Sequence, residues 1–412
     1  MSKLIGNAVV GQSGGPTAAI NATLSGVIRG ALKAKENGVI GTLYGMRNGI
    51  EGFLREDLVD LFSVFDCEEK LRALESTPAA GLGSCRHKLK GHEQDKDTYA
   101  KILEIFRKYD IRYFFYIGGN DSMDTVLKLS RYAASLDYEM RVVGVPKTID
   151  NDLMATDHTP GFGSSAKFVA TTVKEIMRDI EVYTLDAVTI VVIMGRDAGW
   201  LTAASALPVL SGGKGPDLVY LPESVFDADS FIEDVKAALE RHPAVLVTAS
   251  EGIRFADGRY VGEGTDSRAV DAFGHTALSG TGKVLESLVK EKIGCKVRSI
   301  ELSLTQRCAS HVASLTDITE SVKVGMGAVS AATEGKTGVM MTLDRAEGDG
   351  YEITVGTADI SGIANEIKTV PDEYINVERN GITEAGLRYL APLILGEVPC
   401  EYDNGLPKHI II

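Results

Sequence analysis

The stretch Val142-Val-Gly-Val-Pro-Lys-Thr-Ile-Asp-Asn-Asp-Leu153 decides the fold. It begins as a short apolar run, which is typical of a buried strand, and it breaks at Pro146. A lysine, a threonine and two carboxylates follow directly after this proline. Open α/β sheets keep their active sites at the carboxyl ends of their strands. The segment therefore predicts a functional site at the end of a parallel strand.

The side chains that follow this strand suit a phosphorylated substrate and a metal. Asp150 and Asp152 are two residues apart, so in an extended segment they share one face, with Thr148 beside them. Lys147 either points the other way or turns toward whatever the loop folds over. A solvated loop is the alternative that this motif leaves open when it is taken alone.

Length, charge and cysteine content narrow the class of protein. A chain of 412 residues is too long for one ordinary core, which indicates two or more lobes. The net charge of −14 argues against a general binder of nucleic acid or of a membrane surface. Five scattered cysteines without a CxxC pair favour reduced thiols. The longest apolar run, 187–194, is far shorter than the ~20 residues that span a bilayer, so we expect a soluble, cytoplasmic protein.

Other predicted strands also end in glycine-rich or polar segments. These strand ends are Gly11–Thr17, Gly118–Ser122, Met194–Trp200, Ser250–Gly252 and the stretch leading to Arg307. A glycine turn before a helix can present backbone N–H groups to an anion, although a tight turn without a ligand remains open. Asn120 or Asp121 can hold Mg²⁺ through oxygen, or can serve as a helix cap. The basic loop 81–88 can clamp phosphate or lie in solvent.

Strands that alternate with helices throughout predict an α/β fold with mostly parallel sheets. One sheet seldom supplies so many polar strand ends to a single crevice, whereas two lobes that face each other across a cleft do so naturally. No low-complexity linker interrupts the chain, so we expect the lobes to exchange segments.

Taken in order, these segments resemble the phosphofructokinase family. The matching pieces are SGGPTAAIN (13–21), LGSCR (82–86), IGGNDS (117–122), PKTIDND (146–152), MGRDAGWL (194–201), Glu251, Arg298 and Arg307. Each motif is weak alone, and the ordered set is specific. The resemblance implies two Rossmann-like lobes: a phosphoryl-donor lobe of residues 1–160 plus roughly 308–360, and a sugar-phosphate lobe of residues 161–307 plus roughly 361–412.

Two positions separate the phosphoryl donors within that family. ATP-dependent members have glycine at the positions of Asp121 and Lys147, and this chain resembles the pyrophosphate-dependent members. A carboxylate at Asp121 would lie where the α-phosphate of ATP must lie, and like charges in a confined site cost several kcal/mol. Lys147 can supply a compact positive charge to the transferring group.

The resemblance implies a reversible, Mg²⁺-dependent, in-line phosphoryl transfer from pyrophosphate to O1 of fructose 6-phosphate, giving fructose 1,6-bisphosphate. Asp150 is the expected base, oriented by Asp152 and Thr148. The other implied residues are Gly14, Gly15, Arg86 and Gly119 for pyrophosphate, Asn120 and Asp121 for Mg²⁺, Ile149, Met194, Gly195, Arg196, Glu251 and Leu304 for the sugar, and Arg298 and Arg307 for its 6-phosphate.

The chain departs from the family pattern at three positions. Asn120 replaces an aspartate, and Leu304 replaces a histidine or tyrosine that would bond the substrate. Ala187 replaces an arginine that a neighbouring subunit donates. If Arg298 still crosses between subunits, the protein is a homodimer or a homotetramer.

Three alternative functions remain for a protein of this kind, and a fourth alternative is an enzyme of another reaction class. The chain could use ATP, which a donor assay distinguishes, or could act on a related sugar such as sedoheptulose 7-phosphate. A silent regulatory subunit is disfavoured because Asp150 is present, and a nicotinamide oxidoreductase because no dinucleotide fingerprint occurs. We expect Trp200 to belong to the core rather than to a binding site.

Overall fold

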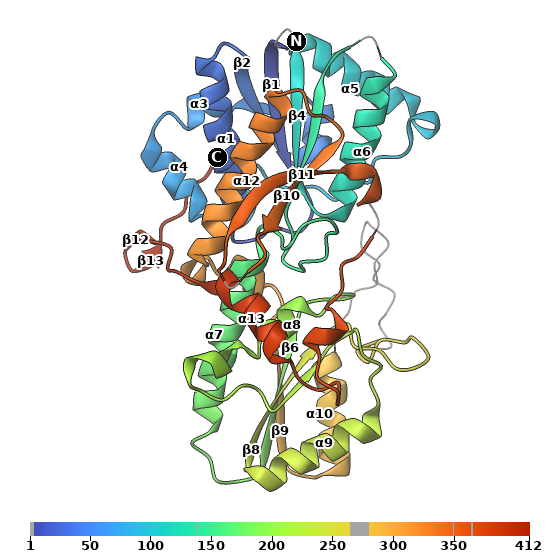
Figure 1. Ribbon diagram of the computed structural model, residues 1–412, viewed down its shortest axis with the longest axis vertical. Coiled ribbons are helices and arrows are strands. Elements are labelled where there is room, and N and C mark those ends of the chain that lie inside the picture. Colours follow the sequence, from blue (N-terminus) through green and yellow to red (C-terminus); the bar gives the residue numbers. More distant parts are fainter. Residues whose placement is uncertain (1–3, 137, 264–279, 349, 364–365) are drawn as a thin grey trace.

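A seven-stranded sheet forms the first of two α/β lobes in the computed structural model, which describes residues 4–136, 138–263, 280–348, 350–363 and 366–412 (Figure 1). In spatial order its strands are β11 (Ile353–Asp359), β10 (Val339–Arg345), β5 (Arg141–Pro146), β4 (Ile111–Gly118), β1 (Gly6–Gln12), β2 (Ile40–Met46) and β3 (Leu58–Asp60). Neighbouring strands are parallel except for β2 with β3 and β10 with β11.

Helices cover both faces of this sheet. Successive strand residues point to opposite faces, so Ala8 and Val10 enter one core and Val9 enters the other. The helices of the first face are α1 (Ile20–Glu36), α3 (Leu61–Val64), α4 (Glu68–Glu75) and α12 (Leu315–Thr333), and those of the second are α2 (Gly49–Leu54), α5 (Lys96–Lys108) and α6 (Asn120–Ala134). Burial on both faces explains why the strands read as nearly continuous apolar runs.

A four-stranded, parallel sheet forms the second lobe. Its strands, in spatial order, are β7 (Leu218–Tyr220), β8 (Ala244–Ser250), β6 (Ala187–Ile193) and β9 (Lys296–Glu301). The helices are α7 (Phe162–Ile180), α8 (Trp200–Ala204) and α13 (Glu384–Leu390) on one face, and α9 (Ala228–Arg241) and α10 (Thr281–Lys292) on the other. The short α11 (Thr305–Cys308) follows β9. The predicted fold class is confirmed, and so is the prediction that Trp200, 3% exposed, lies in the core.

The chain passes between the lobes more than once. After building β6 to β9 of the second lobe it returns through α12, β10 and β11 to complete the first (Figure 1). Helix α12 packs closely on α1, since a Cβ at Gly26 would come within 2.1 Å of the Val322 carbonyl oxygen, and one at Gly325 within 2.2 Å of the Thr23 oxygen. Glycine at both contacts lets the two helix backbones touch. The first lobe is therefore built from segments that are far apart in the sequence.

The last part of the chain contacts both lobes. Leu387 and Leu390 of α13 join the core of the second lobe. After the hairpin of β12 (Tyr402–Asp403) and β13 (Leu406–Pro407), the tail returns to the first lobe, where Ile410 N donates to Thr77 Oγ1 at 2.9 Å. This tail differs from the expectation that residues from roughly 361 to 412 belong to the sugar-phosphate lobe, because Ile410 and Ile412 pack against apolar residues of the first lobe. The other predicted boundaries stay predictions.

None of the helices within the described ranges is long and apolar enough to cross a membrane.

Candidate active site

A cavity of about 470 Å³ lies between the lobes, at the carboxyl ends of strands from both sheets. Most of the residues predicted for the site line it. They are Gly14, Gly15, Arg86, Gly119, Asn120, Asp121, Lys147, Thr148, Ile149, Asp150, Asp152, Met194, Arg196, Glu251 and Arg307. Residues more than 290 positions apart in the sequence therefore meet in one space, as the two-lobe prediction requires.

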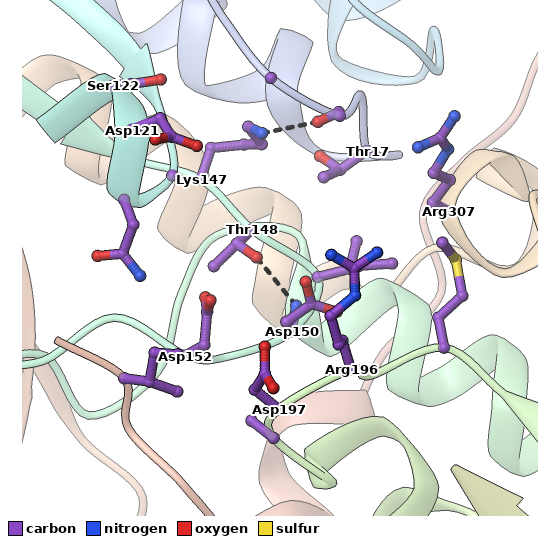
Figure 2. Close-up of a pocket in the computed structure, with 18 of the residues that line it drawn as sticks. Thr17, Asp121, Ser122, Lys147, Thr148, Asp150, Asp152, Arg196, Asp197 and Arg307 are labelled. Carbon is purple, nitrogen blue, oxygen red and sulfur yellow. Dashed lines mark hydrogen bonds between the residues drawn. The ribbon is translucent and has the colours of Figure 1, made fainter. Parts of the chain in front are cut away.

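The loop after β5 carries the central carboxylates (Figure 2). Thr148 fixes its start, because its backbone N–H donates to Pro160 O at 3.2 Å and its carbonyl accepts from Thr159 Oγ1 at 2.9 Å. The Thr148 hydroxyl accepts from the N–H of Asp150 at 3.0 Å. Asn151 has a left-handed backbone, φ 55°, so the loop is not the regular extended segment expected from the spacing. Asp150 and Asp152 nevertheless both line the cavity.

Lys147 turns toward the glycine loop that follows β1. Its Nζ donates to Gly15 O at 2.6 Å, and the residue is only 3% exposed (Figure 2). Burial lowers the pKa of Lys147 to about 8, against the opposing effect of Asp150 and Asp152. Of the two directions that the sequence left open for this side chain, the structure shows the second. The ammonium thus joins the first strand end to the central loop.

The half-buried carboxylates of this loop are shifted toward their protonated forms. Burial raises the pKa of Asp150 to about 7, and repulsion from Asp152 and Glu251 acts in the same direction, while Lys147 and Arg196 oppose it. Burial also raises the pKa of Asp152. A carboxylate with a pKa near neutrality is suited to accept a proton at physiological pH.

The turn between β4 and α6 offers oxygen atoms for a cation. Asn120 Oδ1 is buried and has no hydrogen-bond partner among the described residues. Asp121, the next residue, lines the same cavity, and its Oδ1 lies 3.5 Å from Lys88 Nζ. The described residues contain no cluster of three His, Cys, Asp or Glu that could hold a metal. One amide and one carboxylate oxygen nevertheless fit Mg²⁺, which keeps several waters and shares phosphate ligands with its substrate.

The second lobe supplies Met194, Arg196 and Glu251 to the opposite side of the cavity. Gly195 itself does not line it, but its carbonyl accepts from the Ser250 hydroxyl and so joins the ends of β6 and β8. Burial raises the pKa of Glu251. Arg307, on α11, lies close to the donor side, since a Cβ at Gly15 would come within 3.2 Å of Arg307 Nη1.

Besides Gly195, two predicted residues lie outside the lining of the cavity in this single chain. Arg298 is exposed on β9, which is at the edge of its sheet, and Leu304 is 58% exposed at the start of α11. Neither is brought to the other site residues in this structure, and a role for them stays a prediction.

Several lining residues were missed in the sequence. They are Pro16, Thr17, Lys88, Ser122, Asp197, Ala198 and Ile367. All but one belong to motifs or loops that were recognised, so their proximity to the predicted residues was the available signal. Ile367 carries no such signal, because it comes from a segment without a recognised motif.

Comparison with known proteins agrees with this geometry. Residues 7–332 match the family model described as phosphofructokinase. The chain is 41% identical to pyrophosphate–fructose 6-phosphate 1-phosphotransferase of Methylococcus capsulatus, over 98% of this chain and 96% of that protein, and 42% identical to the protein of the same name from Xanthomonas campestris, with the same coverage.

A solved structure gives the same result. The crystal structure of pyrophosphate-dependent phosphofructokinase from Nitrosospira multiformis superposes with a TM-score of 0.88 at 38% identity, covering 98% of this chain and 96% of the other. The family resemblance stated from the sequence is therefore confirmed.

Proposed function

The chain belongs to the phosphofructokinase family, and from this premise we propose that it transfers a phosphoryl group from pyrophosphate to the 1-hydroxyl of fructose 6-phosphate. The products are fructose 1,6-bisphosphate and phosphate. Relatives with the corresponding name match over nearly the whole chain. The observation that carries the proposal is the meeting of Asp150, Lys147 and the glycine loop in one cavity between the lobes.

Asp150 is the proposed base. In the reaction the sugar O1 forms a bond to the transferred phosphorus while the bond to the bridging oxygen of pyrophosphate breaks, and the hydroxyl proton passes to the Asp150 carboxylate. The raised pKa, about 7, lets this carboxylate both take up and release a proton near neutral pH. Thr148 orients the loop by accepting a hydrogen bond from the Asp150 N–H. Repulsion from the Asp152 carboxylate helps to raise the pKa of Asp150.

The donor occupies the first-lobe side of the cavity in this proposal. Gly14, Gly15, Gly119 and Arg86 surround the pyrophosphate, and the Lys147 ammonium neutralises charge on the transferring group. Because pyrophosphate is the donor, we expect a small drop in free energy and a reaction that runs in both directions.

Asp121 is proposed to exclude nucleotides. Its carboxylate lines the donor side of the cavity, and Asp121 Oδ1 lies 3.5 Å from Lys88 Nζ. The α-phosphate of a nucleotide at this point would be repelled by the negative charge of Asp121. Pyrophosphate, which ends before this point, avoids the repulsion.

The sugar occupies the second-lobe side. Met194, Gly195, Arg196, Glu251 and Ile149 are proposed to contact it. Arg307, with Arg298 and Leu304, is proposed to lie at the 6-phosphate. Since Arg298 is exposed on an edge strand away from its own cavity, its predicted role requires a second subunit, and we propose a homodimer or homotetramer.

Phosphotransferases of this family generally use a divalent metal. We propose Mg²⁺, held by Asp121 and by Asn120 Oδ1, which has no hydrogen-bond partner in the part of the chain that the structure describes. When bound, such an ion offsets negative charge on the phosphate oxygens. We also propose a cytoplasmic location, where the five free cysteines stay reduced.

The donor assignment is tested by the double change Asp121→Gly with Lys147→Gly. The variant and the wild-type protein are assayed with pyrophosphate and with ATP as donor. We expect loss of pyrophosphate-dependent turnover and some gain of ATP-dependent turnover, because the Asp121 carboxylate and the Lys147 ammonium are both removed. Unchanged turnover with pyrophosphate would contradict the assignment.

A further inference from the structure

The loop that carries Asp150 and Asp152 is held by a segment from the far end of the chain. Lys368 contributes four hydrogen bonds to this loop between Asn151 and Asp157. Its backbone N–H donates to Asp152 O at 2.9 Å. Its Nζ donates to Asn151 Oδ1 at 3.2 Å, to Thr156 O at 3.1 Å and to Asp157 O at 2.6 Å. One residue thus fixes both the start and the end of the irregular part of the loop.

The same residue is also fixed to the second lobe. The indole Nε1 of Trp200 donates to Lys368 O at 2.9 Å, and the Lys368 ammonium lies 5.3 Å from the centre of that ring. Two residues later, Val370 N donates to Glu223 Oε1 at 2.8 Å. Trp200 begins α8, the helix that follows Arg196 in the sequence. The segment therefore connects the carboxylate loop to the helix behind the proposed sugar-binding residues.

Charge explains why a lysine suits this position. The carbonyl and amide oxygens of the loop converge on one ammonium, which has three donors to satisfy them. Asp152, Asp157 and Arg345 are the charged groups around it, and burial lowers the pKa of Lys368 to about 8. Its positive charge in turn favours the ionised form of Asp152. Lys368 does not line the cavity, whereas its neighbour Ile367 does.

We propose that Lys368 is a positioning residue for phosphoryl transfer, which holds the Asp150–Asp152 loop against the second lobe so that the base meets the sugar hydroxyl. The inference rests on the proposed function and adds to it a residue outside the recognised motifs. Proximity of reacting groups is sensitive to small shifts, since a displacement of about 1 Å can lower the rate on the order of 10²-fold.

Lys368→Met tests this role, since methionine keeps much of the side-chain length and removes the ammonium. We expect kcat to fall on the order of 10²-fold, with a smaller change in KM for fructose 6-phosphate and unaltered pyrophosphate affinity by calorimetry. We also expect the acid limb of the kcat/KM profile to move to higher pH, because loss of the cation beside Asp152 raises the pKa of the carboxylate pair. Lys336→Met, which removes an exposed lysine bonded to Thr357 Oγ1, is the matched control.

The outcomes separate positioning from simple structural support. A kcat of Lys368→Met equal to that of the control overturns the inference. The inference is also overturned if activity falls only in proportion to the amount of folded protein and the acid limb of the kcat/KM profile does not move. If Lys368→Met does not fold, Trp200→Phe removes the N–H that bonds Lys368 O together with part of the buried ring, and a wild-type kcat in that variant overturns the inference. If the wild-type protein uses a donor other than pyrophosphate, only the proposed function is refuted. The same variants then test the role of Lys368 with that donor.

Discussion

Replacement of Lys147 by methionine is expected to remove most turnover while leaving the fold at least as stable. The ammonium lies 2.6 Å from Gly15 O, in the loop proposed to hold pyrophosphate. Two unit charges about 4 Å apart interact by about 4 kcal/mol at an effective dielectric constant of about 20. Loss of such an interaction in the transition state lowers kcat on the order of 10²–10³-fold.

Stability is expected to change in the opposite direction. The pKa of Lys147 falls from 10.5 to about 8 on folding, so the unfolded chain binds the proton more tightly and the buried charge destabilises the fold below that pH. At about 1.4 kcal/mol for each pKa unit, this cost is about 3 kcal/mol at neutral pH. Methionine removes the cost, although it also loses the hydrogen bond to Gly15, so the free energy of unfolding should stay constant or rise.

The assay measures fructose 1,6-bisphosphate formed from pyrophosphate, together with thermal melts of each protein. Lys174→Met is the control, because Lys174 is exposed on α7 and bonds only the Ser211 hydroxyl in the described structure. A Lys147→Met variant with kcat within about tenfold of wild type would refute the electrostatic reasoning. A large fall in melting temperature would refute the assignment of Lys147 as a destabilising buried charge.

Three further predictions concern titratable groups. The profile of kcat/KM against pH should be bell-shaped, falling below about 7 as Asp150 is protonated and above about 8 as Lys147 loses its proton, and initial rates across this range check it. Asp150→Asn should lower kcat on the order of 10²–10⁴-fold while calorimetry still detects fructose 6-phosphate binding. Burial alone lowers the pKa of His158, but hydrogen bonds to Asp157 and Glu320 outweigh it and raise the pKa, so stability should fall as pH rises through that value. His158→Leu should cost about 3–5 kcal/mol in denaturant unfolding, because the buried Glu320 carboxylate and the half-buried Asp157 carboxylate each lose one charged hydrogen-bond partner.

Local patterns were sufficient to predict the strand ends. The apolar runs at 113–117 and 189–193 lie within β4 and β6, and the observed strands extend them by one or two residues. Strands buried on both faces carry this signal within their own sequence. The polar residues after them met in one cavity because the carboxyl ends of parallel strands share an edge.

Contacts between distant segments could not be predicted in the same way. The direction of Lys147 depends on Gly15, which lies 132 residues earlier, and no local pattern shows which loop is opposite. Ile367 and Lys368 reach the site from a stretch with neither a motif nor a helical period, so only tertiary packing places them there. Arg298 shows the converse, since its motif was recognised but its own chain keeps it away from the cavity.

The return of the chain to its first sheet has a consequence for biosynthesis. Strand β5 gains its neighbour β10 only when residues 339–345 have been made, whereas all four strands of the other sheet end by Glu301. A chain emerging from the ribosome can therefore complete the strands of the later sheet while the earlier sheet still has an open edge and α1 still lacks its partner α12. Exposed edges and apolar faces promote aggregation, so we expect the amino-terminal half of the nascent polypeptide to need protection until α12 and β10 have formed.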